Sequence, residues 1–406
     1  MRATKPVVLS ASVAGAIAGC LLLVLTGASG PDSRLPGSQV VIEAGSYESL
    51  QAAIDALPGE GGIVRLPPGE FTIDEPLVVR TGETSIIGCG PATHIKNVNQ
   101  QGMSALILEK PADQKAALWR IHLQDYRLTG NSKSANGIDT RAINEIDIEG
   151  VTVTHHGGDG IRLDHCYEDP RVCDCLITYN KAVGLNLLGC HDIVVAGNQF
   201  EENNDALHCI DGFNLCMTGN CLDDHLRHGV VIENTYGSVV SGNMIEECNG
   251  TALIMDRDCY GNTVSANVIA HDGKGEDLRD AHGCAISANT FTIMLGDALI
   301  IGPQSGRITV TGNNFSNSYI GDGKVKRGQE QLMAGGVRLS GAQDVTFVGN
   351  LLAGLNPEAF TTEDPPSQRV AVVANVLRNV ESQHDALVES QVTDNLHRGD
   401  GTVEGT

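Results

Sequence analysis

An asparagine that recurs at intervals in the low twenties constrains the fold of this chain more than any other feature. It usually follows a glycine or an alanine, and it stands at Asn198, Asn220, Asn243, Asn267, Asn289, Asn313, Asn350, Asn375 and Asn395. Columns of apolar residues keep the same interval, three positions before the asparagine and two positions after it. This pattern is typical of a solenoid, in which each coil buries its apolar face against the neighbouring coils.

The repeat continues backwards to positions where the asparagine itself is lost. The apolar columns persist around Tyr126, Val151 and Cys175, which gives about twelve coils. Because aromatic residues are only 4% of the chain and β-branched residues fall in short alternating pieces, the composition favours an all-β solenoid over a helical one. Asparagine tolerates left-handed backbone and forms local hydrogen bonds in turns, so we interpret the ladder as structural. We predict one domain over residues 31–406, with coils from about 60 to 395 and a tail at 396–406.

The first thirty residues are typical of a targeting segment. Arg2 and Lys5 precede an uncharged, mainly apolar run from 7 to 25, and small residues at 28–30 offer a cleavage site. The run is also barely long enough to span a bilayer, and Cys20 lies in a sequence similar to a lipoprotein box. A cleaved signal, an uncleaved anchor and a lipoprotein all remain open. Each of them predicts that the solenoid is extracytoplasmic, and only this segment would contact a membrane.

The net charge of residues 31–406 limits the kinds of molecule that the protein can bind. Residues 1–30 hold two of the 27 basic residues and none of the 50 acidic ones, so 25 − 50 leaves a net charge near −25. Such an acidic surface repels nucleic acid and anionic membranes. It also repels a polyuronate, unless cations or a local basic patch intervene.

Twelve cysteines are many for an exported protein, and most stand singly, one per coil. Stacked cysteines that act as small apolar residues are one interpretation. Disulfides between neighbouring coils are another, because an oxidising compartment permits them. A zinc site is disfavoured, since no paired Cys/His spacing is present.

The segment before the coils predicts a cap for the first coil. Ser46 is a candidate N-cap for a helix over 46–57 that places Leu50, Ile54 and Leu57 on one face. A solenoid exposes an apolar end, which a helix of this kind covers.

The same segment resembles the pectate lyase superfamily, in particular its rhamnogalacturonase-like and epimerase-like branch. The resemblance rests on SLQAAIDALPGEGGIVRLPPGEFTI at 49–73, on SIIGCG at 85–90, and on the coil repeats after them. It implies a right-handed parallel β-helix that is secreted and acts on polysaccharide. The superfamily includes lyases, hydrolases, epimerases and non-catalytic proteins, so the fold alone does not decide the activity. The catalytic motifs of polygalacturonases, mannuronan epimerases and calcium pectate lyases are not found here, so no catalytic residue is carried over.

Candidate site residues come instead from the outward columns of one strand of each coil. Alternation along a strand places every second residue outside, and equivalent residues of neighbouring coils stack. The columns gather titratable groups over about five coils: Asp159, Arg162, Asp164, His165, Asp205, His208, His228, Glu233 and Asp256.

These groups predict sugar chemistry in several forms. Asp159 and Asp205 lie two coils apart, roughly 9 to 10 Å, which suits an inverting hydrolase pair. His208 and His228 are candidate acids or bases near neutral pH, and Arg162 and Asp164 are candidate substrate contacts. Glu233 and Asp256 stand one coil apart and suit a retaining pair or two calcium ligands. Each also has a plain structural interpretation. An aspartate before Gly or Ala is a common turn cap, and Glu233 and Asp256 suit a solvated edge.

Two stretches depart from the repeat. Residues 271–282 carry eight charged or titratable groups where an apolar strand is expected, which indicates a charged excursion. The interval before Asn350 is longer than its neighbours, and the extra residues include Lys324, Lys326 and Arg327, a basic loop suited to an anionic substrate.

The sequence therefore predicts an extracytoplasmic protein that cleaves a polysaccharide, expected to be acidic, by elimination or hydrolysis, with epimerisation also open. A non-catalytic solenoid that binds glycan or acts as a spacer, and a periplasmic metal-binding β-helix protein, are the alternatives. Calcium is the only cofactor that the residues suggest.

Overall fold

A computed structural model describes residues 40–317, 335–355, 358–378 and 380–398 of the chain. All of them belong to one compact unit that spans residues 39–406. The targeting segment predicted at 1–30 and the basic loop with Lys324, Lys326 and Arg327 lie outside the described residues, as does most of the predicted tail. Within the described ranges, no helix combines the length and the apolar character that a bilayer crossing requires.

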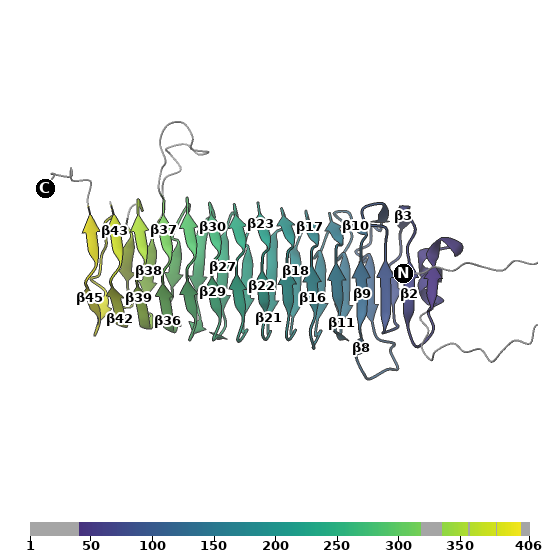
Figure 1. The fold of residues 1–406 in the computed structure, drawn as a ribbon, viewed down its shortest axis with the longest axis horizontal. Coiled ribbons are helices and arrows are strands. Elements are labelled where there is room, and N and C mark those ends of the chain that lie inside the picture. Colours follow the sequence, from purple (N-terminus) through teal and green to yellow (C-terminus); the bar gives the residue numbers. More distant parts are fainter. Residues whose placement is uncertain (1–39, 318–334, 356–357, 379, 399–406) are drawn as a thin grey trace, which may run out of the picture. The chain divides into compact units, whose positions relative to one another are not determined.

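The chain winds through three parallel sheets in turn, and successive coils lie side by side (Figure 1). Sheet A contains β1 (Val41–Glu43), β2 (Gly62–Arg65), β5 (Thr84–Ile87), β9 (Ile121–Gln124), β13 (Asp147–Glu149), β16 (Arg171–Cys173), β19 (Val194–Ala196), β22 (Cys216–Thr218), β25 (Val239–Ser241), β28 (Cys259–Tyr260), β29 (Thr263–Ser265), β32 (Ala281–His282), β33 (Ala285–Ser287), β36 (Gly306–Thr311), β39 (Gln343–Val348), β42 (Ser367–Val373), β44 (Leu387–Val388) and β45 (Gln391–Thr393).

Sheet B contains β3 (Gly69–Ile73), β6 (Thr93–Asn97), β10 (Arg127–Thr129), β14 (Thr152–Thr154), β17 (Leu176–Thr178), β20 (Gln199–Glu201), β23 (Cys221–Asp223), β26 (Met244–Glu246), β30 (Val268–Ala270), β34 (Thr290–Thr292), β37 (Asn314–Ser316), β40 (Leu351–Ala353), β43 (Val376–Arg378) and β46 (Leu396–Arg398).

Sheet C contains β4 (Leu77–Val79), β7 (Leu106–Glu109), β11 (Ile138–Arg141), β15 (Ile161–Asp164), β18 (Val183–Leu188), β21 (Asp205–Ile210), β24 (Val230–Glu233), β27 (Thr251–Asp256), β31 (Lys274–Leu278), β35 (Leu299–Ile301), β38 (Val337–Ser340) and β41 (Phe360–Glu363). A small separate pair joins β8 (Leu118–Trp119) and β12 (Ile143–Asn144). The fourteen described strands of sheet B correspond to about fourteen coils, close to the twelve predicted; the coils of β3 and β6 lie before the backward limit of the repeat at Tyr126.

The predicted asparagine ladder is the corner between sheets A and B, and we call it the asparagine corner. Asn220 illustrates its hydrogen bonds. Its backbone N–H and its side-chain amide both donate to the Oδ1 atom of Asn243 in the next coil, at 3.0 and 2.9 Å. The same side chain also donates to the carbonyl oxygen of Val195 at 3.0 Å. The left-handed backbone belongs to the residue before each asparagine, such as Gly219 with φ 66°. The ladder is structural, as predicted, because it satisfies buried polar groups at every coil.

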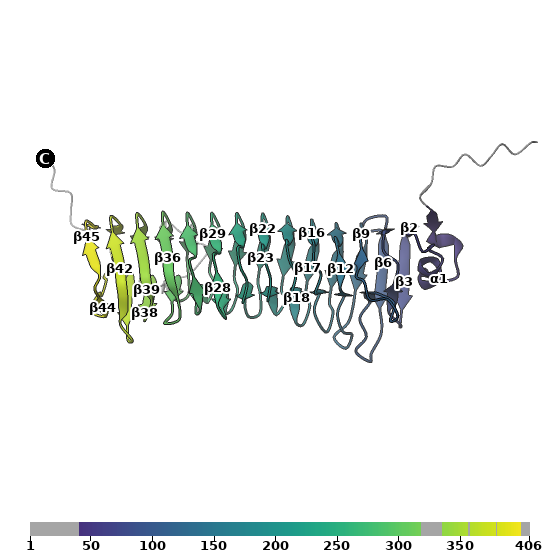
Figure 2. The ribbon, with the colours of Figure 1, turned by 90° about the horizontal axis from the view of Figure 1, so that it is seen from below.

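The predicted cap helix is present but shorter than expected. Helix α1 spans Leu50–Asp55, and the Ser49 hydroxyl, rather than that of Ser46, caps it by accepting from the Ala52 amide at 3.0 Å. Ser46 instead ends the 3-10 helix η1 (Ala44–Ser46), since extended backbone at Tyr47 separates the two helices. Leu50 and Ile54 are buried against the first coil, which α1 covers (Figure 2).

The charged excursion predicted at 271–282 is wrong. These residues form β31, which pairs in register with β27 and β35, and β32, which pairs with β28. Lys274 and Arg279 are exposed, whereas Asp272, Glu276 and Asp277 are buried. Glu276 pairs between Leu253 and Leu299 in an inward column and has no exposed surface.

Candidate functional site

The strand register pairs residues of neighbouring coils that were predicted to stack along sheet C. Asp205 pairs with Val183 in β18, and His208 pairs with Asn186. Glu233 pairs with Asp256. Three predicted residues come together at β21 and the turn before β24, namely Asp205, His208 and His228.

Asp205 organises this group although it is completely buried. Its Oδ2 atom accepts from Nε2 of His208 at 2.7 Å. Its Oδ1 atom accepts from the His228 backbone N–H at 2.9 Å and from Nε of Arg227 at 2.8 Å. A second guanidinium nitrogen of Arg227 donates to Oδ2, so the arginine is bidentate.

The charge state of Asp205 follows from these contacts. Burial by itself would raise the pKa of this carboxyl, but hydrogen bonds from Arg227, His208 and the His228 amide outweigh burial and hold the pKa well below its usual value. Asp205 is therefore ionised and can only accept. Nε2 of His208 must carry a proton, which leaves Nδ1 of the neutral ring with a lone pair.

His228 has the opposite tautomer. Its Nδ1 atom accepts from the Thr251 backbone N–H at 3.0 Å, so the neutral ring carries its proton on Nε2. Burial lowers the pKa of His228, and the nearby Arg227 and Arg279 lower it further. The site thus places a lone pair on His208 and an N–H on His228 in two adjacent coils. His208 can accept a proton from a substrate, and His228 can donate a hydrogen bond to it.

Arg227 is the residue that the columns did not predict. It lies in the turn before β24, outside the strand positions that alternation assigns, and its side chain remains about half exposed. The signal in the sequence was the crowding of His225, Arg227 and His228 in one coil. Because only one edge of the guanidinium binds Asp205, the other edge is free for an anion.

Asp159 lies two coils from Asp205, as predicted, but its carboxylate is hydrogen-bonded to residues of the next coil. Oδ1 accepts from the Val183 backbone N–H at 3.0 Å, and Oδ2 accepts from the Asn186 amide at 2.8 Å. This geometry is that of the turn cap, so the structure does not bring Asp159 to the His208 group.

Arg162 and Asp164 form a separate network at β15. Arg162 contacts Asp164 at 2.9 Å and Asp139 at 3.4 Å, and Arg141 also reaches Asp164. Burial would raise the pKa of the Asp164 carboxyl, but hydrogen bonds from His165 and Arg141 outweigh it and lower that pKa. These charges are matched with one another, which leaves the network little net charge for a substrate.

The pair proposed as calcium ligands is adjacent, as predicted, but each carboxylate has an arginine partner. Arg257 contacts Glu233 at 2.9 Å, and Arg279 lies 3.7 Å from Asp256. Cations beside both carboxylates disfavour calcium there.

Two other groups in the described ranges bring three potential metal ligands within 4.8 Å of one another. One is Asp223, Asp224 and Glu247, which is purely carboxylate. The other is Asp258, Asp280 and His282, at the corner between sheets C and A. In this second group Asp280 accepts from the Asp258 backbone N–H at 2.8 Å and contacts Nε2 of His282 at 3.1 Å.

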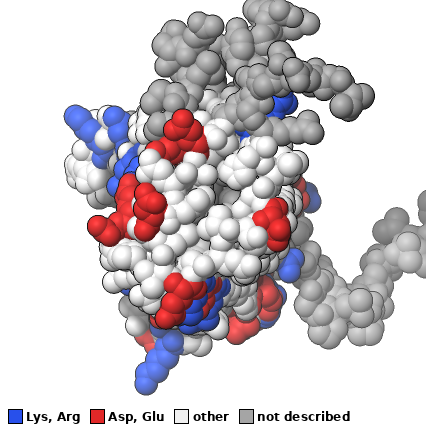
Figure 3. Space-filling view, turned by 90° about the vertical axis from the view of Figure 1, so that its left-hand side faces the viewer, with Lys and Arg blue, Asp and Glu red and all other residues white. Residues whose placement is uncertain are grey.

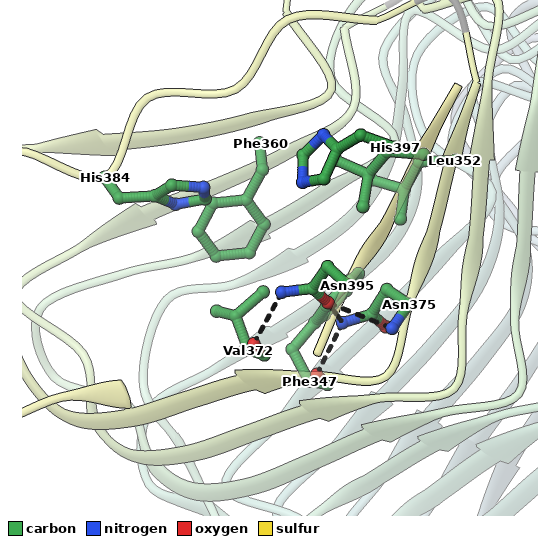
Figure 4. Close-up of a pocket in the computed structure, with 9 residues that line it drawn as sticks. Phe347, Leu352, Phe360, Val372, Asn375, His384, Asn395 and His397 are labelled. Carbon is green, nitrogen blue, oxygen red and sulfur yellow. Dashed lines mark hydrogen bonds between the residues drawn. The ribbon is translucent and has the colours of Figure 1, made fainter. Parts of the chain in front are cut away.

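A cavity at the C-terminal end of the solenoid is too small for a sugar. Phe347, Phe360, His384 and His397 are among its lining residues (Figure 4), and its volume of ≈ 10 Å³ holds about one water molecule. Viewed onto this end, uncharged residues fill much of the middle and charged side chains lie toward the rim (Figure 3). Two larger hollows lie elsewhere in the described chain, one of ≈ 350 Å³ beside Arg120 and one of ≈ 300 Å³ beside Lys181. The face of sheet C is preferred for the chemistry of its side chains and not for its shape.

Solved structures confirm the right-handed parallel β-helix. The A-module of the mannuronan C-5 epimerase AlgE6 from Azotobacter vinelandii superposes with a TM-score of 0.55 at 16% identity, over 86% of this chain and 94% of the module. The catalytic unit of a thermostable GH87 α-1,3-glucanase from Streptomyces thermodiastaticus gives a TM-score of 0.52 at 16% identity, over 90% and 70% of the two chains. At this identity the likeness establishes the fold and leaves the chemistry to the site.

Sequence comparison gives a family. No curated protein matches the chain. The family described as periplasmic copper-binding protein (NosD) matches residues 119–211 and 183–357, which together span 119–357 and so more than half of the 406 residues. These are the coils that carry the asparagine corner and the His208 group, and the chain belongs to the NosD family.

Proposed function

We propose that this protein cleaves an acidic polysaccharide outside the cytoplasm by β-elimination on the outer face of sheet C. The observation that carries the proposal is the group around the ionised Asp205, which gives His208 and His228 opposite tautomers and fixes Arg227 beside them. The periplasmic description of the family and the polysaccharide-active proteins of the same fold support the compartment and the class of substrate.

Each residue has one task in the elimination. Nδ1 of His208 removes the proton from the carbon next to the uronate carboxylate, while Asp205 stabilises the imidazolium that forms. Arg227 pairs with the substrate carboxylate as negative charge spreads onto it. Nε2–H of His228 donates a hydrogen bond to the departing glycosidic oxygen, which takes its proton from water. The C–H and C–O bonds break, and a double bond forms between the two carbons. The positive charge of Arg227 also offsets locally the repulsion expected between the acidic protein and a uronate.

Hydrolysis is less well supported by the same geometry. Glycoside hydrolysis usually needs two carboxyl groups free to act on the substrate. Here Asp159 caps the next coil, Asp205 is occupied by four donors, and Glu233 and Asp256 lie beside arginines.

The test is the ultraviolet absorbance of unsaturated product on a panel of polyuronates and neutral glycans, with and without a chelator. We expect His208→Ala to lower turnover by about 10²- to 10⁴-fold. His122→Ala, an exposed histidine of sheet A, is the matched control and should be unchanged. Full turnover by His208→Ala, or reducing ends without unsaturation, would contradict the proposal.

Metal binding is the second candidate, and the Asp258, Asp280 and His282 group favours it. Two carboxylates and an imidazole suit a divalent transition metal such as Cu²⁺ or Zn²⁺. Calorimetry with each ion should show binding that His282→Ala weakens and His122→Ala does not. Equal affinity in both variants would exclude this group.

A further inference from the structure

A line of exposed and half-buried rings runs along the corner between sheets C and A, and we call it the aromatic ridge. One ring comes from each of five consecutive coils: Tyr167, His191, Phe213, Tyr236 and Tyr260. The ring centroids of Tyr167 and His191 lie 4.7 Å apart, those of His191 and Phe213 4.5 Å, and those of Phe213 and Tyr236 5.4 Å. The backbones of Tyr236 and Tyr260 are paired, so the line is continuous.

The ridge is not needed to close the core. The residue before each ring points inward, and Cys166, Cys190 and Cys259 at these positions are completely buried. The rings outside them stay in solvent: Tyr167 is 39% exposed, Phe213 41% and Tyr260 49%. Soluble proteins rarely leave a contiguous row of large aromatic rings uncovered without a partner.

Polar side chains beside the rings are suited to hydroxyl groups. The Asn214 amide donates to Asp192 at 2.7 Å, and the Asn234 amide donates to Asp211 at 2.8 Å, so each pair places an amide beside a carboxylate of the previous coil. The Tyr236 hydroxyl contacts Asn234 at 3.1 Å. Such planar groups retain spare donors and acceptors, which match the neighbouring hydroxyls of a sugar.

We propose that the aromatic ridge binds a neutral polysaccharide chain laid along the coils, separately from the His208 group. The apolar C–H groups of a pyranose pack against aromatic side chains, and the rise of about 4.8 Å per coil is close to the length of one sugar residue. A neutral chain fits better than a polyuronate, because the exposed acidic residues of the flank outnumber its two arginines, Arg257 and Arg307. The acidic residues are Glu168, Asp169, Asp192, Asp211 and Asp258.

This inference shares only the partner class, polysaccharide, with the proposed function and requires no catalysis. The alternative role of the rings is structural, since aromatic pairs in contact stabilise a fold without any ligand. A ridge that serves stability alone would bind no sugar, so binding decides between the two roles.

The experiment is calorimetric titration of the whole protein with neutral gluco- and manno-oligosaccharides and with a uronate oligomer. We expect Phe213→Ala and Tyr236→Ala each to weaken neutral binding about tenfold. Phe213→Trp should retain it. Tyr179→Ala is the control, because Tyr179 is also 39% exposed and stacks on His155 on another face. Binding to the uronate alone, binding unchanged in the ridge variants, or no binding by the wild type would overturn the proposal.

The two proposals fail independently. His208→Ala should lose elimination but bind the neutral oligosaccharide with wild-type affinity, and Phe213→Ala should keep elimination. Loss of neutral binding in His208→Ala, with an unchanged melting temperature, would place that binding on sheet C and contradict the ridge.

Discussion

Two interior corners of this solenoid perform the same task with different residues. The asparagine corner repeats one amide from Asn198 to Asn395. The corner between sheets B and C, here the mixed corner, holds a column that changes at almost every coil: His156, Asn180, Asn203, His225, Cys248 and Asp272, all completely or almost completely buried. Both columns offer polar groups to the neighbouring coil, as Asn203 Oδ1 does to the Asn180 backbone N–H at 3.0 Å.

The mixed corner differs from the asparagine corner in two ways. It has buried polar groups without hydrogen-bond partners, and residues of the candidate site follow it in the chain. Nε2 of His225 and both carboxylate oxygens of Glu276, just after the mixed corner, have no hydrogen-bond partner in the ranges that the structure describes. The mixed corner also leads within two residues to Asp205 and Arg227. The variable corner thus lies beside the candidate site, and we expect the uniform corner to contribute more to stability.

The asparagine corner can be broken at one residue. Asn243→Leu removes the acceptor of both the Asn220 backbone N–H and the Asn220 side-chain amide. Two buried donors without partners should cost about 3–5 kcal/mol of unfolding free energy. Urea unfolding and hydrogen exchange in the adjacent coils measure this loss. Met244→Ala, at the exposed neighbouring residue, is the control, and a loss in Asn243→Leu below about 1 kcal/mol would show that the ladder is dispensable.

The period of the repeat decides how much of the molecule could be predicted. A repeat fixes the register, so the ladder, the sheet C columns and the pairing of Glu233 with Asp256 could all be read from spacing. Arg227 could not, because its side chain acts from a turn where no alternation applies. Glu276 was misassigned for a related reason: a charge in a strand pattern predicts an exposed loop, whereas coils on both sides impose the strand.

The aromatic ridge was also missed, although its rings repeat with the period. Each ring stands in a different local sequence, with histidine replacing tyrosine at His191, so no single residue type marks the column. Only the register at the corner aligns them.

Glu276 gives the next largest effect and tests the strand that begins just after the mixed corner. Burial raises the pKa of this carboxyl from 4.5 to about 8. The unfolded chain therefore ionises at lower pH than the folded one, and stability should fall as pH rises from about 4.5 to about 8, by on the order of 3–5 kcal/mol. Glu276→Leu matches Leu253 and Leu299 in the same column, so it should remove this loss.

Unfolding free energies at pH 5 and pH 8 measure the prediction. Glu276→Gln is the control, because it cannot titrate but still buries a polar group. The Gln variant should lose the pH dependence attributable to Glu276. Its unfolding free energy should rise less than that of Glu276→Leu, because the amide is still a buried polar group. A pH dependence unchanged in both variants would mean that Glu276 is already ionised in the folded protein.

The smallest effect comes from making the mixed corner resemble the asparagine corner. Burial lowers the pKa of His225 to about 4, below its ordinary 6.5. Between about pH 6.5 and pH 4, His225 is protonated in the unfolded chain but not in the folded one. Stability should therefore fall as pH drops through this range. His225→Asn replaces the partnerless Nε2 with an amide like that of Asn203, and it should add about 1 kcal/mol at pH 7. It should also reduce the loss of stability as pH falls, whereas Glu276→Leu removes a loss that occurs as pH rises. Thermal unfolding at pH 4.5 and 7 distinguishes these effects; a destabilised His225→Asn at both values would show that the imidazole volume, rather than its polarity, holds this corner.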